Sequence, residues 1–269
     1  STLHCAGHDH GDDEPDHDHE HEEHGVPVID LRNRRIDVRG ELRQPIAGIE
    51  RLSFRGAFTD YVHNEMEGDE VATTFTNEGY DTRLELEHAR VGSMRGMVGV
   101  QASRSDFAAV GAEAFLPESR TTSTALFALE EFDLGAVRLE GAARQEWQDI
   151  EDASHEPFSI SAGAVWSLAP DWSAAVSLSR SQRAPTAQEL YARGVHLATN
   201  TYEIGTPTLD VETANAAEVS LRRTRGDTTF SASAYRYQYD GYIYADTLDA
   251  FEAFRLIRYS QSGAASRGR

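Results

Sequence analysis

The chain has 269 residues, with 45 Asp and Glu against 25 Lys and Arg and a formal net charge of −20 at pH 7. A chain this acidic is a poor binder of nucleic acid, because neutralising phosphates requires Lys and Arg. The single cysteine, Cys5, excludes an internal disulfide and reads as a soft metal ligand or a bystander. No apolar run approaches the ~18 residues that a membrane-spanning helix requires.

Residues 1–34 form a segment rich in His, Asp and Glu. Seven of the eleven histidines and nine carboxylates fall within the first 24 residues, which contain no Lys or Arg. Without apolar periodicity such a segment cannot bury a face, so we expect a mobile loop. Imidazole and carboxylate suit Zn²⁺, and also Cu²⁺ or Ni²⁺, so we predict metal capture, with a solvated acidic tail as the alternative. The predicted ligands are His4, His8, His10, His17, His19, His21 and His24.

Strict alternation of apolar and polar residues begins after this segment. Ile36, Val38, Gly40 and Leu42 occupy one set of alternate positions, and the positions between them are charged. Period-two alternation indicates a strand with one apolar and one polar face. The same pattern recurs at residues 52–59, 82–87, 137–144 and 218–222.

The spacing of the breaks between these strands is also regular. Short turns at 45–47, 91–92, 133–134, 170–171 and 226–227 alternate with long polar connections at 1–34, 62–78, 105–120, 149–157, 184–210 and 244–253. Short turns at one end and long loops at the other are typical of a transmembrane β-barrel. A soluble all-β protein is the alternative, but its loops would be of mixed length and its strands shorter. We count eleven strands.

Aromatic residues lie near the predicted strand ends and suit the aromatic girdles of a membrane barrel. They are Trp147, Trp166, Trp172, Tyr235, Tyr237, Tyr239, Tyr242 and Tyr244. We assign residues 35–261 to the barrel wall. Residues 262–269 lack the alternation, and we expect an irregular C-terminal tail there.

Two stretches carry a family resemblance. The run L-S-R-S-Q-R-A-P-T-A-Q-E-L-Y at 178–191 resembles the strand-to-loop segment of TonB-dependent outer-membrane receptors. The run G-T-P-T-L-D-V-E-T-A at 205–214, followed by Glu218, resembles a second motif of that family. Within these stretches Pro185 ends strand pairing, and Thr186 and Glu189 are placed as the N-cap and N3 residues of a short helical turn.

The His-rich segment, residues 26–31 and the run A-R-G-V-H-L-A-T-N-T-Y-E at 192–203 resemble the zinc-uptake receptors within that family. The resemblance implies part of a 22-stranded barrel in the outer membrane of a Gram-negative bacterium. It also implies a plug domain inside the barrel, and energy supplied by TonB-ExbB-ExbD through that plug. The chain shows no initiator Met, no signal peptide and no plug, so we expect it to be a C-terminal barrel fragment.

For an inner metal site we select His196, in a loop expected to face the outer vestibule, with Glu203 as a second ligand. A hydrogen-bonded loop histidine is the alternative reading of His196. We expect His63 and His155 to be solvated and His88 to be structural. No catalytic motif is present, so we expect no enzyme and no catalytic cofactor.

The hypothesis from the sequence is therefore uptake of zinc, as cargo, across an outer membrane. The first alternative keeps the barrel and changes the cargo to haem, a siderophore, copper or nickel. The second is a secreted, zinc-sequestering β-protein without a transport role.

Overall fold

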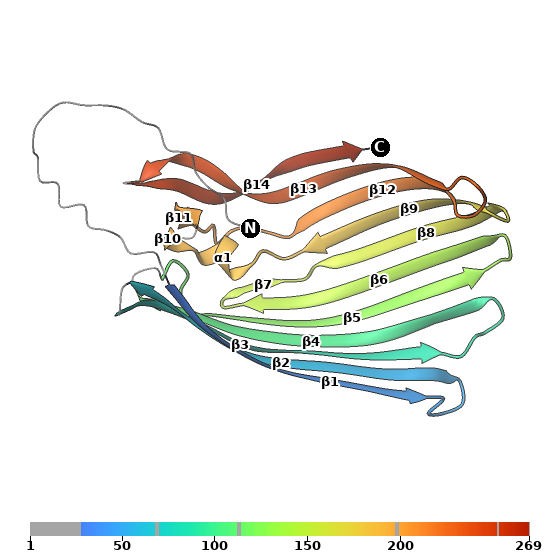
Figure 1. Cartoon of the computed structure of the whole chain (residues 1–269), viewed down its shortest axis with the longest axis horizontal. Helices are drawn as coiled ribbons and strands as arrows, with labels where there is room; N and C mark the ends of the chain where they lie inside the picture. The colour runs from blue at the N-terminus through green and yellow to red at the C-terminus, as the bar shows by residue number, and fades with distance from the viewer. Residues whose placement is uncertain (1–27, 68–69, 112–113, 197–198, 252, 269) are drawn as a thin grey trace, which may run out of the picture.

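The computed structural model describes residues 28–67, 70–111, 114–196, 199–251 and 253–268. These residues form one sheet of fourteen strands, in the order β1-β2-β3-β4-β5-β6-β8-β9-β12-β13-β14-β11-β10, with β7 paired to β6 (Figure 1). All its pairings are antiparallel except that of β11 with β14. Three of the fourteen strands are short, which leaves eleven long ones and confirms the partial all-β barrel expected from the sequence.

The eleven long strands are β1 (Val28–Arg43), β2 (Ile49–Glu67), β3 (Glu70–His88), β4 (Met94–Gly111), β5 (Ser119–Asp133), β6 (Val137–Ile150), β8 (Phe158–Ala169), β9 (Trp172–Arg183), β12 (Glu212–Arg223), β13 (Phe230–Phe251) and β14 (Phe254–Gly268). The short elements are β7 (Ala153–His155), α1 (Ala187–Tyr191), β10 (Arg193–His196) and β11 (Thr201–Ile204). Within the described ranges, no helix has the length and apolar character needed to cross a bilayer.

The register of the strands places the apolar residues on one face of the sheet. Leu42, Leu52, Leu86 and Val98 are successive cross-strand partners on β1 to β4. Directly opposed residues share a face, so these rows build a continuous surface, which we call the apolar face. Ile36 on this face remains 65% exposed, as expected for a side chain that contacts lipid.

The opposite face, which we call the lumenal face, is lined with ion pairs. Arg51 contacts Glu87 at 2.6 Å, and Arg83 contacts Glu85 at 2.7 Å. Arg83 also lies over the ring of Phe127, 4.1 Å from its centroid. One apolar face and one charged face are what a barrel wall between lipid and a wet lumen requires.

Five short connections lie together at one end of the sheet (Figure 1). They are residues 44–48, 89–93, 134–136, 170–171 and 224–229, close to the predicted turns. The longest described connection, between β9 and β12, lies at the opposite end and contains α1, β10 and β11. The predicted turns are therefore found together at one end, and the predicted long loop at 184–210 is found at the other.

Two of the predicted long loops are instead continuations of strands. β2 runs to Glu67 and β3 starts at Glu70, so the loop expected at 62–78 is wrong. β13 likewise runs to Phe251 and β14 starts at Phe254, across the predicted loop at 244–253. Polar composition does not end a strand, because backbone hydrogen bonds to the neighbouring strand satisfy the chain whatever its side chains are.

The structure also differs from the prediction at both ends of the barrel wall, which was predicted to span residues 35–261. β1 begins at Val28, so the segment before the wall ends earlier than residue 34, and residues 1–27 lie outside the described residues. The prediction of an irregular tail at 262–269 is wrong for residues 262–268, because β14 pairs with β13 as far as the Tyr235–Gly268 partners. The small residues there lack alternation, but alternation reports side-chain environment and is not needed for pairing.

The aromatic prediction is correct for only part of the set. Trp166 is exposed, and its partner Val137 follows the register of the apolar face. Tyr235, Tyr237 and Tyr239 lie on the other face, because Ala234 is the residue of β13 that opposes Val219 of the apolar face. These tyrosine rings contact one another along the strand rather than forming a girdle.

Candidate functional site

The connection between β9 and β12 begins with the short helix α1. Thr186 is its N-cap: the Thr186 hydroxyl accepts from the backbone N–H of Glu189, and the Glu189 carboxylate accepts from the Thr186 N–H. This is the predicted capping box. Arg183, at the end of β9, donates to both oxygens of Glu189 and to Glu212 on β12, which ties the helix to the wall.

The segment then returns through the hairpin β10–β11, which attaches to the wall in an unusual way. β11 pairs in parallel with β14, with Glu203 opposite Ile257. Gly205 packs so closely on α1 that a Cβ at this position would lie 2.5 Å from the backbone of Leu190. The backbone N–H of Gly205 donates to the carbonyl of Ala192 at 2.6 Å. The hairpin is therefore held by backbone contacts on two sides.

Glu203 is the centre of a buried hydrogen-bond network in this hairpin. Its side chain is 2% exposed, and both carboxylate oxygens are engaged. Oε1 accepts from His196 Nδ1 at 2.8 Å and from the Thr201 hydroxyl at 3.2 Å. Oε2 accepts from Gln188 Nε2 at 2.7 Å and from the Tyr259 hydroxyl at 2.9 Å. A buried carboxylate needs this number of donors to remain charged.

The network also fixes the state of His196. Burial raises the pKa of Glu203, but the hydrogen bonds from Gln188, His196 and Tyr259 outweigh burial, and the net shift is downward. Glu203 is therefore ionised at neutral pH and can only accept hydrogen bonds. The proton of the shared hydrogen bond must then belong to His196 Nδ1, so a neutral His196 carries its lone pair on Nε2.

His196 faces a cavity of 440 Å³ on the lumenal side of the wall. The ring of Phe115 stacks on His196, with 4.2 Å between centroids and 9° between planes. Across the cavity lining, His63 stacks in the same manner on Phe75, at 4.4 Å and 21°. The volume lies in the range of about 300–1,000 Å³ that is common for ligand pockets.

The described residues do not complete a metal site at this cavity. Nowhere in the described ranges do three His, Cys, Asp or Glu side chains gather closely enough to hold a metal ion. The structure does bring together the two predicted inner residues, His196 and Glu203. However, both oxygens of Glu203 are already used, so the geometry favours Glu203 as the residue that orients His196, and ligation by Glu203 stays a prediction.

The other histidines have defined environments. His63 is paired with Tyr61 at 2.9 Å and packed on Phe75, so the expectation of a solvated side chain is wrong. His155 is buried, with Nε2 3.2 Å from the Leu209 carbonyl, so it is not solvated either. His88 contacts Glu130 at 3.1 Å and the Ala89 carbonyl at 2.8 Å, as expected of a structural residue.

The seven predicted N-terminal ligands, His4, His8, His10, His17, His19, His21 and His24, lie outside the described residues, and their metal binding stays a prediction. Sequence reasoning missed Gln188, Tyr259 and Phe115. Tyr259 is 56 residues from Glu203 in the sequence, and their contact depends on the parallel pairing of β11 with β14. No local sequence pattern predicts that pairing. Gln188 lies within the run at 178–191 that carries the family resemblance, but its sequence position does not indicate a contact with Glu203.

Comparison with known proteins identifies the wall. Residues 29–268 match the family described as TonB dependent receptor-like, β-barrel. The siderophore receptor PirA from Pseudomonas aeruginosa is 17% identical and has a TM-score of 0.71, over 90% of this chain and 46% of that one. The copper transporter OprC is 15% identical and has a TM-score of 0.75, over 88% of this chain and 42% of that one. The hemophore receptor HasR from Serratia marcescens, in complex with its hemophore HasA and heme, is 13% identical. Its TM-score is 0.70, over 90% of this chain and 46% of that one.

At these identities the structural likeness shows the fold alone, and the chain spans less than half the length of each of these proteins. The family match is independent of them and covers nearly the whole chain. Barrels of this family are outer-membrane proteins of Gram-negative bacteria, and they act as receptors and transporters rather than enzymes. That location excludes the secreted, zinc-sequestering alternative. The chain belongs to the TonB-dependent receptor β-barrel family.

Proposed function

We propose that this barrel wall is part of a receptor that takes up zinc across the outer membrane. The observation that carries the proposal is the composition of the first 24 residues, which hold seven histidines and nine carboxylates without one Lys or Arg. This donor set suits borderline divalent cations, and the uncompensated carboxylates concentrate cations near the segment. In the proposal, the segment captures dilute metal outside the cell.

Transfer inward requires the first site to release the ion. A segment that must be ordered in order to bind loses affinity to that ordering, so it holds metal more weakly than a preformed site. His196 is the proposed next acceptor, because Glu203 fixes its tautomer with the Nε2 lone pair available and Phe115 fixes its ring. Histidines that bind metals commonly donate their other nitrogen to a carboxylate in this way.

His196 is one ligand, and the remaining ligands of an inner site come, in the proposal, from outside the described residues. Energy for release into the periplasm comes from TonB-ExbB-ExbD through the plug domain that the family resemblance implies. Affinity falls with acidification, because imidazoles with an ordinary pKa near ~6.5 protonate and lose their lone pairs.

The test is competition binding of Zn²⁺, Cu²⁺ and Ni²⁺ to the full-length receptor. Because Cu²⁺ binds most nitrogen and oxygen sites more tightly than Zn²⁺, intrinsic affinity alone does not identify the cargo. We therefore combine binding with uptake of radioactive Zn²⁺ by cells, measured with and without the receptor. Zinc uptake that depends on the receptor and saturates supports the proposal, and receptor-independent zinc uptake overturns it.

A different cargo is the second candidate. The fold neighbours include a siderophore receptor, a copper transporter and a hemophore receptor, so the wall itself is compatible with several cargo classes. The cavity beside His196 and His63 is lined by Phe75, Phe107 and Phe115, which would also suit an organic carrier of a metal. Growth of a receptor-deletion strain on haem, ferric siderophore or copper as the limiting nutrient separates these candidates from zinc.

A further inference from the structure

One arginine at the short-turn end of the wall finds no acceptor for its hydrogen bonds. Arg223 is the last residue of β12, and its even separation from Val219 and Leu221 places it on the apolar face. Its Nε is buried and lacks a hydrogen-bond partner, which among the described residues is true of only one other side-chain atom, Nδ1 of His155. Buried polar groups are normally paired, so an unpaired one in a guanidinium indicates a missing partner.

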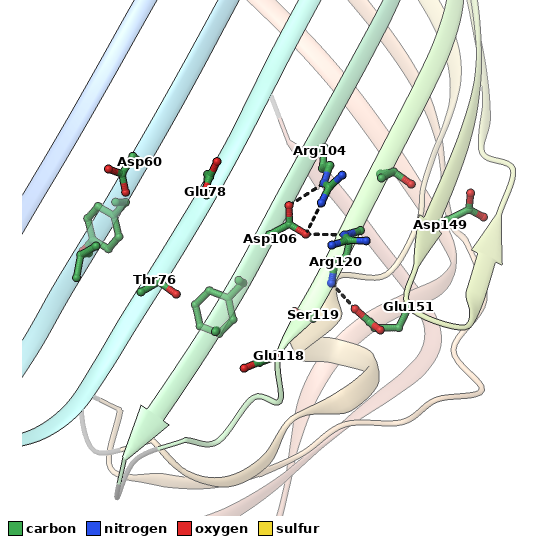
Figure 2. A pocket seen from close by; sticks show the side chains of 15 residues that line it. Asp60, Thr76, Glu78, Arg104, Asp106, Glu118, Ser119, Arg120, Asp149 and Glu151 are labelled. Atoms are coloured by element: carbon green, nitrogen blue, oxygen red, sulfur yellow. Dashed lines mark hydrogen bonds and ion pairs between the residues drawn. The ribbon is translucent and has the colours of Figure 1, made fainter.

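Charged side chains at the loop end of the wall are arranged differently. Arg104 and Arg120 both donate to Asp106, at 2.7 and 2.6 Å (Figure 2). Arg223 forms no ion pair with any residue in the described ranges, although Asp171 lies in the neighbouring turn. A guanidinium carries five N–H donors and no acceptor, so all five remain without an acceptor from these parts of the chain.

Two aromatic rings close over the base of this side chain. Trp172 of β9 and Phe230 of β13 are the cross-strand partners of Arg223 on its two sides. The rings meet edge to face with 5.2 Å between centroids, so they bridge β12 above Arg223. The Cζ of Arg223 lies 5.8 Å from the centroid of the Trp172 ring. This cation–π contact stabilises the charge, but a ring face does not replace the acceptors that the terminal nitrogens require.

The terminal nitrogens of Arg223 lie toward the turn and not toward the hydrocarbon. A Cβ on Gly226 would lie 2.9 Å from Nη2 of Arg223, so the guanidinium rests against the connection between β12 and β13. The backbone N–H of Thr224 donates to the carbonyl of Asp171 at 2.9 Å, which joins this connection to the preceding turn. Arginines near the end of a membrane span commonly reach for the headgroup layer in this manner. Since short turns face the periplasm, that layer belongs to the periplasmic leaflet.

We propose that Arg223, Trp172 and Phe230 bind the phosphate group of a glycerophospholipid in the periplasmic leaflet. The two Nη groups donate to two phosphate oxygens, because the planar guanidinium matches phosphate geometry. The aromatic rings contact the glycerol region, since amphipathic rings suit the level of the headgroups. Leu221, two residues further along β12, continues the apolar face toward the acyl chains.

The charge and the position of the site favour a lipid phosphate over a soluble anion. The chain has a formal net charge of −20, which repels anions in solution. A lipid phosphate is confined by its acyl chains to the layer in which the guanidinium lies. The acidic residues of the two adjoining connections, Asp171 and Asp227, leave Arg223 unpaired, so its donors are free for this acceptor.

The test uses the full-length receptor, released from nanodiscs, and does not depend on the identity of the cargo. The probes are phosphatidylglycerol and a neutral diacylglycerol with the same acyl chains. Native mass spectrometry measures the lipid retained by the wild type, Arg223→Gln, Arg223→Lys and Arg222→Gln. Arg222→Gln is the matched control, because it removes the same charge from the adjacent residue, which lies on the lumenal face. Heat-modifiable migration on gels shows that each variant is folded.

We expect the wild type and Arg222→Gln to retain phosphatidylglycerol equally, and Arg223→Gln to hold it about tenfold more weakly, as for the loss of one charge-assisted hydrogen bond. Arg223→Lys should fall between them, because an ammonium group keeps the charge without the bidentate fork. Equal retention by Arg223→Gln and Arg222→Gln, or retention of diacylglycerol as strong as that of phosphatidylglycerol, would overturn the proposal. So would full competition by millimolar inorganic phosphate, which would assign the site to a soluble anion.

Discussion

The imidazole Nδ1 of His196 lies 2.8 Å from Oε1 of Glu203, and the second oxygen of that carboxylate lies 2.9 Å from the hydroxyl of Tyr259 on the wall. One buried carboxylate thus links a loop histidine to the barrel. The orientation of His196 is consequently set by β14 as well as by its own hairpin. Changes at Glu203 should affect the loop and leave the wall intact.

Glu203→Gln is the most direct test of this link. The substitution keeps the size of the side chain but replaces one accepting oxygen with a donor, which then faces the donors Gln188 or Tyr259. We expect a loss of about 1–3 kcal/mol in the local stability of residues 186–206, the usual effect of an unsatisfied buried polar group. Hydrogen exchange of the loop amides measures this loss. The exposed Glu140 on β6 supplies the control, Glu140→Gln, which should leave the same amides protected.

The loop should also tolerate moderate acid. The pKa values of Glu203 and Glu189 both lie below the ordinary glutamate value in the folded chain, because hydrogen bonds outweigh burial at each. A group with a depressed folded pKa contributes stability above its unfolded pKa and loses it as pH falls through the folded value. Protection of loop amides, corrected for intrinsic exchange, should therefore hold from neutral pH to about pH 4.3 and decline only below it. A loss of amide protection that is already complete at pH 6 would contradict the depressed pKa values of Glu203 and Glu189.

Gly205 should be intolerant of any side chain. A Cβ there would meet the carbonyl carbon and oxygen of Leu190 at 2.5 Å, and backbone atoms cannot give way as a flexible side chain can. We expect Gly205→Ala to separate β11 from α1, raising proteolysis within the loop without changing the heat-modifiable migration of the barrel. Gly40→Ala, where nothing lies within 4 Å of the added carbon, should behave as the wild type. Equal behaviour of the two variants would show that the close approach does not constrain the loop.

The His-rich segment should matter only when zinc is scarce. Deleting residues 4–24 removes its seven histidines, and we expect slower growth at limiting zinc with normal growth in replete medium. Replacing only those seven histidines with asparagine preserves length and charge, and should reproduce the defect if imidazole ligation is the cause. A defect of equal size in replete medium would assign the segment some role other than zinc capture.

The membrane wall was predictable because its physical cause is local. A strand between lipid and water must alternate, and the alternation at Ile36, Val38 and Leu42 reports that directly. Strand ends were less predictable, because polar strands such as residues 70–78 are held by pairing with a neighbour and not by their own pattern. The same reason explains the wrong tail, where residues 262–268 pair with β13 despite lacking alternation.

The site was predictable only in part. His196 and Glu203 are seven residues apart and share a hairpin, so their contact could be anticipated from one short stretch. Gln188, Tyr259 and Phe115 come from three other segments, and only the folded chain brings them to the same carboxylate and the same ring. His155 is buried against the carbonyl of Leu209 in the β9–β12 connection, and His63 is half-buried against Phe75 of the neighbouring strand. Both contacts join residues that are distant or on another strand, so the local sequence does not predict them.

The parallel pairing of β11 with β14 has a consequence for the shape of the barrel mouth. A strand offers hydrogen bonds along two edges, and between Arg255 and Arg258 β14 uses one edge for β13 and the other for β11. Any further strand of the wall can join β14 only closer to the periplasm than Arg258. At this end of the wall the His196 hairpin therefore occupies the edge of β14 that β13 leaves open.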